Sequence, residues 1–172
     1  QTIFSGKNIK VSGSGSDDGL NVKNSTVFIE DSHFFDNSGD QIDLDFVTGE
    51  VTGSLFNRSD RTNESDGLDV SGSKVLVFEN VFQNFGDKGL SIGEQSELLV
   101  VANKFHNNEQ GIAVKDGSTA CIINNEFIVN NKDVISYVKK KMYREPVYDV
   151  RYDSQIPTSL TDIRSYEGCN FE

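Results

Sequence analysis

The chain is poor in several residue types, and each shortage narrows the functions that fit it. Its 172 residues include no tryptophan, one methionine, two prolines and two cysteines. No apolar run approaches the roughly 20 residues of a membrane-spanning helix, and no signal-peptide pattern is present. We therefore expect no membrane span. The missing tryptophan counts against sugar binding, because sugar sites usually stack on aromatic rings.

Positive charge is also scarce. Sixteen lysines and arginines stand against 27 aspartates and glutamates, which gives a formal charge of −11. Nucleic acids and anionic membranes are bound through clustered Lys and Arg, so we expect neither as a partner. The same charge disfavours acidic polysaccharides unless metal ions intervene.

The two cysteines are far apart, at Cys121 and Cys169. Cys121 lies within a strand-like run, where a lone cysteine usually behaves as a small buried apolar residue. We expect a buried free thiol; the alternative is a disulfide that holds the C-terminal segment in place.

An internal repeat dominates the rest of the chain. Four units open on Gly-[Leu/Ile]-x-[Val/Ile], and five close on a small polar residue two positions before a phenylalanine. The opening apolar residues fall at Leu20, Ile42, Leu68, Leu90, Ile112 and Ile135, and the closing ones at Phe34, Phe56, Phe82, Phe105 and Phe127. Both series advance by 22 or 23 residues, except for one step of 26. Such a period is the mark of a stacked repeat architecture.

Each unit reads as strand, turn and strand. Apolar and polar residues alternate with a period of two, as in Leu68-Asp69-Val70, and Gly, Asn, Asp and Ser separate the runs. No segment before residue 137 has the 3.6-residue period of a helix, and the leucine-rich-repeat consensus is absent. Stacked units place like residues about 4.8 Å apart.

These openings and closings, over about residues 17–137, resemble the right-handed parallel β-helix proteins, a superfamily that includes pectate lyases and alginate epimerases. The resemblance implies an all-β solenoid of about six rungs. It also implies that Asn80, Asn103 and Asn125 form an asparagine ladder at one bend, beside stacked Phe82, Phe105 and Phe127.

The domain organisation follows from a change in composition near residue 137. All five tyrosines and both prolines lie in the last 36 residues. We expect a β-helix over 1–137 and a mixed capping segment of the same domain over 138–172, with a strand near Val147–Tyr152 and a short helix after Pro157. Because the chain starts within a strand-like phrase, we also expect it to be a piece of a longer protein with further domains.

One outward face is acidic. Aligning the repeats makes Asp43 and Asp69 rung neighbours, with Asp45 beside them, Lys23 next to Asp45, and Asp66 just before the following strand. Stacked carboxylates repel, so a cation, a shared proton or Lys23 should offset them. We expect carbohydrate binding through Asp43, Asp45, Asp66 and Asp69. Oxygen ligands in this arrangement suit Ca²⁺, which makes Asp43, Asp45 and Asp69 the candidate metal ligands.

Two alternatives remain for this face. The resemblance implies that a polysaccharide lyase or epimerase would pair such carboxylates with a basic residue, for which Lys23, Arg58 and Arg61 are the candidates; Asp43 and Asp69 would also serve a glycoside hydrolase. The other explanation is a solvated acidic face that keeps the solenoid soluble.

A second outward face is apolar. It is formed by Phe28, Leu76, Phe78, Leu99, Val101, Cys121 and Ile123. Contiguous apolar surface marks an interface, so we expect the C-terminal segment, another domain or a second copy of the chain to cover it.

These observations predict a carbohydrate-interacting β-helix module, non-catalytic and extracytoplasmic or at the cell surface, with Ca²⁺ as its candidate cofactor. A lyase, epimerase or hydrolase is one alternative, and a structural spacer that docks another domain is the other.

Overall fold

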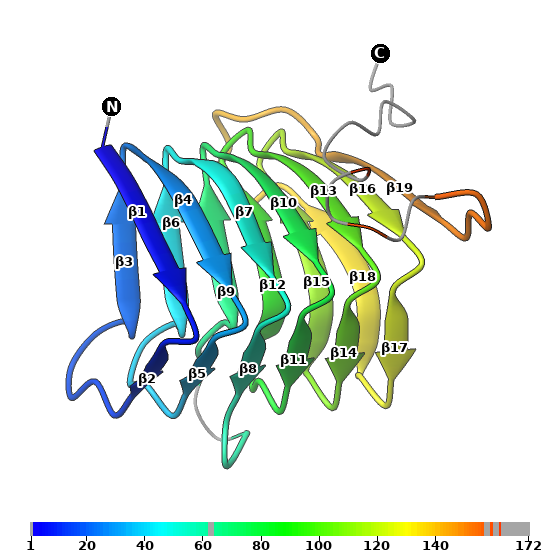
Figure 1. The fold of residues 1–172 in the computed structure, drawn as a ribbon. Coiled ribbons are helices and arrows are strands. Elements are labelled where there is room, and N and C mark those ends of the chain that lie inside the picture. Colours follow the sequence, from blue (N-terminus) through cyan, green and yellow to red (C-terminus); the bar gives the residue numbers. More distant parts are fainter. Residues whose placement is uncertain (1, 62–63, 157–158, 160–161, 163–172) are drawn as a thin grey trace.

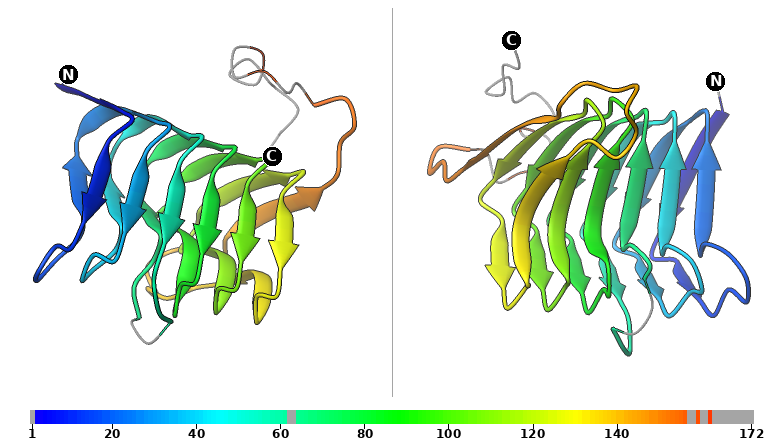
Figure 2. Two further views of the ribbon diagram at one scale, coloured as in Figure 1. Left: turned by 60° about the horizontal axis from the view of Figure 1, so that its bottom comes forward. Right: turned by 180° about the vertical axis from the view of Figure 1, so that it is seen from behind.

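The chain coils into a right-handed solenoid of about six turns, and its strands form three parallel β-sheets (Figures 1 and 2). The structure is a computed structural model that describes residues 2–61, 64–156, 159 and 162. This is the predicted parallel β-helix. Among the described residues, no helix has the length and apolar character needed to cross a membrane.

Each turn contributes one strand to each sheet. Sheet A contains β1 Thr2–Lys7, β4 Ser25–Glu30, β7 Thr48–Thr52, β10 Lys74–Phe78, β13 Glu97–Val101, β16 Thr119–Ile123 and β19 Val147–Arg151. Sheet B contains β2 Lys10–Ser12, β5 His33–Phe35, β8 Leu55–Asn57, β11 Val81–Gln83, β14 Lys104–His106 and β17 Glu126–Ile128. Sheet C contains β3 Leu20–Lys23, β6 Ile42–Asp45, β9 Leu68–Ser71, β12 Lys88–Gly93, β15 Gln110–Lys115 and β18 Lys132–Tyr137.

The strand register follows the sequence repeat almost throughout. Ile42 pairs with Leu68, and Leu68 pairs with Leu90, so the opening apolar residues stack inside the coil. The last unit differs from the expectation: Val134, not Ile135, pairs with Ile112. The assignment of Ile135 was wrong by one residue because two β-branched residues stand side by side there, and alternation selects the one whose side chain faces inward.

Stacked phenylalanines fill one side of the core. The rings of Phe34, Phe56, Phe82, Phe105 and Phe127 succeed one another with centroids 4.8–5.4 Å apart and interplanar angles of 6–14°. The first four are completely buried. The repeat thus places one phenylalanine ring per turn in a single column, each ring stacked on that of the next turn, as predicted.

Ladders of side-chain hydrogen bonds connect successive turns at the three bends. The predicted asparagine ladder is present: the side-chain oxygen of Asn103 accepts from the Asn80 backbone and amide nitrogens at 2.8 and 3.0 Å, and Asn125 does the same for Asn103 at 2.9 Å. Two further ladders were not predicted from the sequence. Serine hydroxyls link Ser73, Ser96 and Ser118 between sheets C and A, and asparagines link Phe85, Asn108 and Asn130 between sheets B and C.

The outward apolar face on sheet A is partly covered from within the chain. Phe78, Val101, Cys121 and Ile123 form a buried cluster with Ile156, so the expected cover by the C-terminal segment is confirmed at Ile156. The residues left at the surface are Phe28, which is 39% exposed, and the partly buried Leu76 and Leu99. Docking of another domain on them stays a prediction.

Cys121 is not the free thiol that we expected, because it is disulfide-bonded. The chain's other cysteine, Cys169, lies outside the described residues. The burial expected for Cys121 is confirmed at 1% exposure. A burial pattern cannot distinguish a thiol from a disulfide, since both sulfurs are apolar and the pairing depends on a distant segment.

The chain after β18 contributes twice to the solenoid. Its predicted strand is β19, which pairs with β16 and extends sheet A. Before β19, a loop passes over the end of sheet C, where the backbone nitrogens of Lys139 and Lys140 donate to Asp116 Oδ1 at 2.7 and 2.8 Å (Figure 2). The helix expected after Pro157 lies largely outside the described residues, although the Ser159 hydroxyl does accept from the Asp162 backbone.

The phenylalanine stack makes a clear stability prediction. Replacing Phe82 with alanine should lower the free energy of unfolding by about 3–5 kcal/mol, because the cavity between two neighbouring rings cannot close. The measurement is urea unfolding followed by circular dichroism. Phe28→Ala is the matched control, since its ring is partly exposed on the outside; equal losses in the two variants would contradict the role assigned to the stack.

Candidate functional site

The acidic face is the outer surface of sheet C. The strand register confirms that its residues stack on one another as the sequence predicted. Asp43 pairs with Asp69, Asp45 pairs with Ser71, and Lys23 pairs with Asp45. Since side chains alternate along a strand, all of these point away from the core. The stacking expected for the outward carboxylates is therefore present.

Two of the predicted ligands are already engaged by neighbours on the first turn. Lys23 Nζ lies 2.6 Å from Asp45 Oδ2, and the hydrogen bond and charge of Asp45 raise the pKa of Lys23. Asp43 Oδ2 accepts from the Asn21 amide at 2.5 Å. Asp43 and Asp45 are half-buried, and these contacts place them at the margin of the site.

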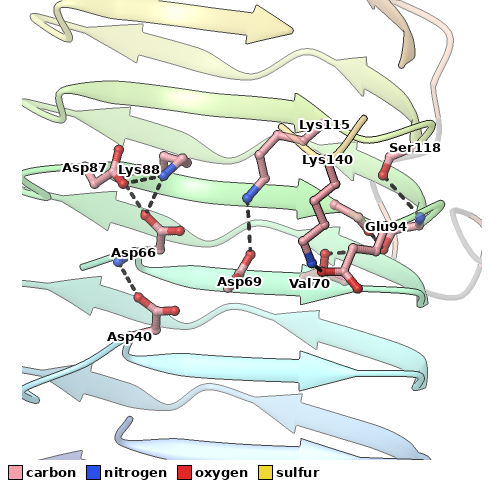
Figure 3. A network of polar contacts seen from close by, with 12 residues as sticks. Asp40, Asp66, Asp69, Val70, Asp87, Lys88, Glu94, Lys115, Ser118 and Lys140 are labelled. Atoms are coloured by element: carbon pink, nitrogen blue, oxygen red, sulfur yellow. Dashed lines mark hydrogen bonds and ion pairs between the residues drawn. The ribbon is translucent and has the colours of Figure 1, made fainter. Parts of the chain in front are cut away.

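The convergent carboxylates are Asp40, Asp66 and Asp69. One oxygen from each lies within 4.8 Å of the others, and Figure 3 shows Asp66 between Asp40 and the lysines of the next turns. Asp66 and Asp69 were among the predicted site residues, whereas Asp40 was not. The sequence did contain a signal for Asp40, because it stands one turn before Asp66 at the same position of the repeat.

Hydrogen bonds explain why aspartate repeats in that column. Asp18 Oδ1 accepts from the backbone nitrogen of Asp40 at 2.9 Å, and Asp40 Oδ1 accepts from that of Asp66 at 2.6 Å. Asp66 Oδ1 then accepts from that of Lys88 at 3.0 Å. Each carboxylate thus satisfies a backbone donor at the bend of the next turn, and its second oxygen is left for other partners.

Two buried lysines complete the cluster. Lys88 Nζ lies 3.4 Å from Asp66 Oδ1 and also pairs with Asp87. Lys115 Nζ reaches 3.9 Å from Asp69 Oδ1, two turns away. Each lysine side chain is only 8% exposed. On the intervening turn its side chain passes Gly93, where an added Cβ would be in ordinary van der Waals contact with the lysine Cε at 3.5 Å.

Small residues that point outward form the surface of sheet C beside these lysines. Ser91 and Ala113 pair with each other on adjacent strands and are fully buried, although both point away from the core. The Ser91 hydroxyl has no hydrogen-bond partner among the described residues. Burial raises the pKa of Tyr137, and the charges of Lys88, Asp87 and Asp66 also act on it, so this phenol belongs to the same electrostatic cluster.

Burial and mutual repulsion make the carboxyls hard to ionise. Burial, together with the charge of Asp66, raises the pKa of Asp40 to about 7. Burial raises the pKa of Asp66 to about 6 although Lys88 opposes it, and burial with Asp45 and Asp69 raises that of Asp43 to about 6. Near neutral pH the cluster therefore favours a proton, a metal cation or another positive group.

The candidate basic residues from the long loop have structural contacts. Arg58 is 9% exposed, and its Nη1 donates to the Asn37 carbonyl and to the Ser65 hydroxyl at 2.5 and 3.2 Å. Arg61 bonds the Asn107 side chain at 2.9 Å and lies 3.4 Å from Glu109. These contacts lie at the bend between sheets B and C. They hold the loop that makes one step of the repeat 26 residues long.

The raised pKa values predict how stability depends on pH. A carboxyl whose pKa is higher in the folded chain binds more protons there, so its contribution to stability is greatest near pH 4 and is lost as pH rises to about 7. Asp40→Asn keeps an oxygen that can accept from Asp66 and should be more stable than the wild type at about pH 8. Its advantage should shrink near pH 5. Thermal melts at both values test this.

Asp17→Asn is the control for this experiment, because Asp17 is an exposed aspartate outside the cluster. If Asp40→Asn and Asp17→Asn shifted the midpoint equally at both pH values, the proton affinity of the cluster would be disproved.

Comparison with known proteins agrees with the fold. The profile of the family described as the right handed beta helix region matches residues 1–143. Searches of curated proteins and of solved structures gave no match. Because the profile covers most of the chain and the three sheets form the corresponding solenoid, this protein belongs to the right-handed β-helix family.

Proposed function

We propose that the protein is a non-catalytic carbohydrate-interacting module that binds its glycan on the outer face of sheet C, and that Asp40, Asp66 and Asp69 bind Ca²⁺ there. The observation that carries the proposal is the convergence of three carboxylate oxygens within 4.8 Å. The backbone hydrogen bonds that Asp40 and Asp66 accept engage one oxygen of each. Like charges held together oppose folding, so the convergence of the carboxylates favours a bound cation.

The donor set suits a hard cation. Ca²⁺ takes six to eight oxygen ligands in flexible geometry, and each of the three residues offers a carboxylate. Asp69 Oδ1 is buried and has no hydrogen-bond partner among the described residues, its nearest cation being Lys115 at 3.9 Å. The remaining ligands would come from water or from sugar hydroxyls, which would couple the metal to the glycan.

The shape of the face supports a polymeric ligand. Six parallel strands present their outward side chains in straight rows, and solenoids use such extended surfaces for binding. Carboxylates accept hydrogen bonds from sugar hydroxyls along these rows. The excess of acidic residues in the chain excludes a simple electrostatic attraction for polyanions.

Binding fits the contacts better than catalysis. A lyase or epimerase needs a base that is available to the substrate, whereas Lys23 is paired with Asp45, and Arg58 and Arg61 make the structural contacts described above. Asp66 and Asp69 are each accompanied by a buried lysine, which favours a fixed charge arrangement over proton transfer.

The chemistry of Cys121 supports our proposal for the compartment. Disulfides persist in oxidising environments outside the cytoplasm, and Cys121 is disulfide-bonded. This supports an extracytoplasmic or cell-surface location. Further domains of a parent protein remain proposed partners, through the exposed part of the sheet A face.

Calcium should stabilise the fold. Binding to the folded chain alone adds about 2.7 kcal/mol to the free energy of unfolding at one hundred times the dissociation constant. A melt in millimolar Ca²⁺ should therefore have a higher midpoint than one in EDTA, and Asp69→Asn should abolish the difference. Asp45→Asn, on the margin of the site, should retain most of it. An identical midpoint with and without Ca²⁺ would remove the metal from the proposal.

Glycan binding should depend on the same residues. On a glycan array, Asp66→Asn and Asp69→Asn should lose at least about tenfold in affinity for any glycan that the wild type retains, a loss of roughly 1.4 kcal/mol. Circular dichroism would establish that both variants fold. Wild-type binding that survives both substitutions, or its complete absence, would favour a structural spacer; product formation would favour an enzyme.

A further inference from the structure

A strained aromatic residue stands at the end of the acidic face. Phe46 follows Asp45 directly where β6 ends, and 60% of its surface is exposed. Its φ of 54° lies in the left-handed region, which a bulky L-residue rarely adopts. Thirteen other non-glycine residues of the described chain share this conformation, Ala102 and Val129 among them, so the residue type at this bend is the feature that needs an explanation.

The equivalent positions of the neighbouring turns show what the bend itself requires. All of them have positive φ, and they are occupied by Asn24, Gly72, Glu94 and Asp116. Three of these four are the residue types that tolerate a left-handed backbone best. An aromatic residue therefore departs from the local rule, and nothing in the geometry of the bend calls for it.

The ring is held in place without being buried. A Cβ added to Gly72 on the next turn would come within 2.6 Å of Phe46 Cε1 and 2.7 Å of Cδ1, so the ring rests against this glycine. Gly72 provides a flat support, while most of the ring surface stays in water. An exposed aromatic on a rigid support is preorganised for stacking.

The ring and the carboxylates are arranged along one strand. The strand itself runs from Ile42 to Asp45, and Asp43 and Asp45 face outward on it. From Asp43, which pairs with Asp69 of the cluster, to Phe46 the chain advances three residues, or about 10 Å at roughly 3.3 Å per residue. A glycan of several units that lies along β6 would touch the carboxylates at one end and Phe46 at the other.

We propose that Phe46 is a stacking platform for a sugar ring and that the glycan carries cationic amino sugars. This inference rests on the proposed function and specifies its ligand. The ring supplies the apolar contact that the absence of tryptophan had left unassigned. The aspartates of β6, β9 and the residues that precede them outnumber Lys23, Lys88 and Lys115, so sugar ammonium groups are attracted where uronates are repelled.

The test uses calorimetry with three hexasaccharides in EDTA: the glucosamine, N-acetylglucosamine and galacturonate hexamers. The wild type should bind the glucosamine hexamer most tightly. Phe46→Asn should lose at least about fivefold in affinity, as expected for a truncated aromatic anchor, and Phe46→Tyr should retain it. Phe28→Asn, which changes a partly exposed aromatic on the sheet A face, is the control.

A thermal melt separates function from folding. Phe46→Asn places the residue type of position 24 in the strained position, so its midpoint should equal or exceed that of the wild type while binding falls. A large loss of stability would show that Phe46 is a structural residue and would overturn the inference.

Further outcomes distinguish this inference from the proposed function. If Phe46→Asn binds the glucosamine hexamer as the wild type does, or if the galacturonate hexamer binds as tightly in EDTA, the inference fails. The proposed function survives that result as long as Asp66→Asn and Asp69→Asn abolish binding of a glycan on the array. If the wild type does not bind the glucosamine hexamer, the ligand class assigned here is wrong.

Discussion

In-register hydrogen bonding between successive turns is the constraint on which this structure depends. Every strand bonds its equivalent in the next turn, and Asn103 and Ser96 repeat the same contact at the bends. Buried polar groups are costly unless they are paired, so each ladder fixes the height and rotation of the next turn. A residue type that recurs in one column of the sequence consequently becomes a row of touching side chains, as in the phenylalanine stack.

The same constraint creates the candidate site. Stacking is favourable for phenylalanine and asparagine but unfavourable for aspartate, whose charges repel at that spacing. The chain relieves part of this repulsion with Lys88 and Lys115 and leaves the rest at Asp40 and Asp66, where the pKa values remain high. We propose that this remaining negative charge attracts a cation, either Ca²⁺ or the ammonium group of a sugar.

Departures from the repeat indicate where the chain does something other than fold. Phe46 occupies a bend position at which neighbouring turns carry Asn24 and Gly72. Cys121 occupies an outward column shared with Leu76 and Leu99, where it is disulfide-bonded and packs in a cluster with Ile156 of a later segment. We propose that the first departure serves ligand binding, whereas the second stabilises the solenoid. Each is visible only against the regular pattern around it.

The sequence by itself determined the solenoid, its period, the phenylalanine and asparagine stacks and the pairing of Asp43 with Asp69, because a repeat of fixed length in a parallel coil leaves few other registers. It did not identify Asp40 as a member of the cluster, the reach of Lys115 across Gly93, Val134 as the inward residue of the last turn, or the disulfide of Cys121. These depend on how far a side chain extends between turns and on which residues a later segment covers. Such distances are absent from a linear pattern and arise only when the turns are stacked in three dimensions.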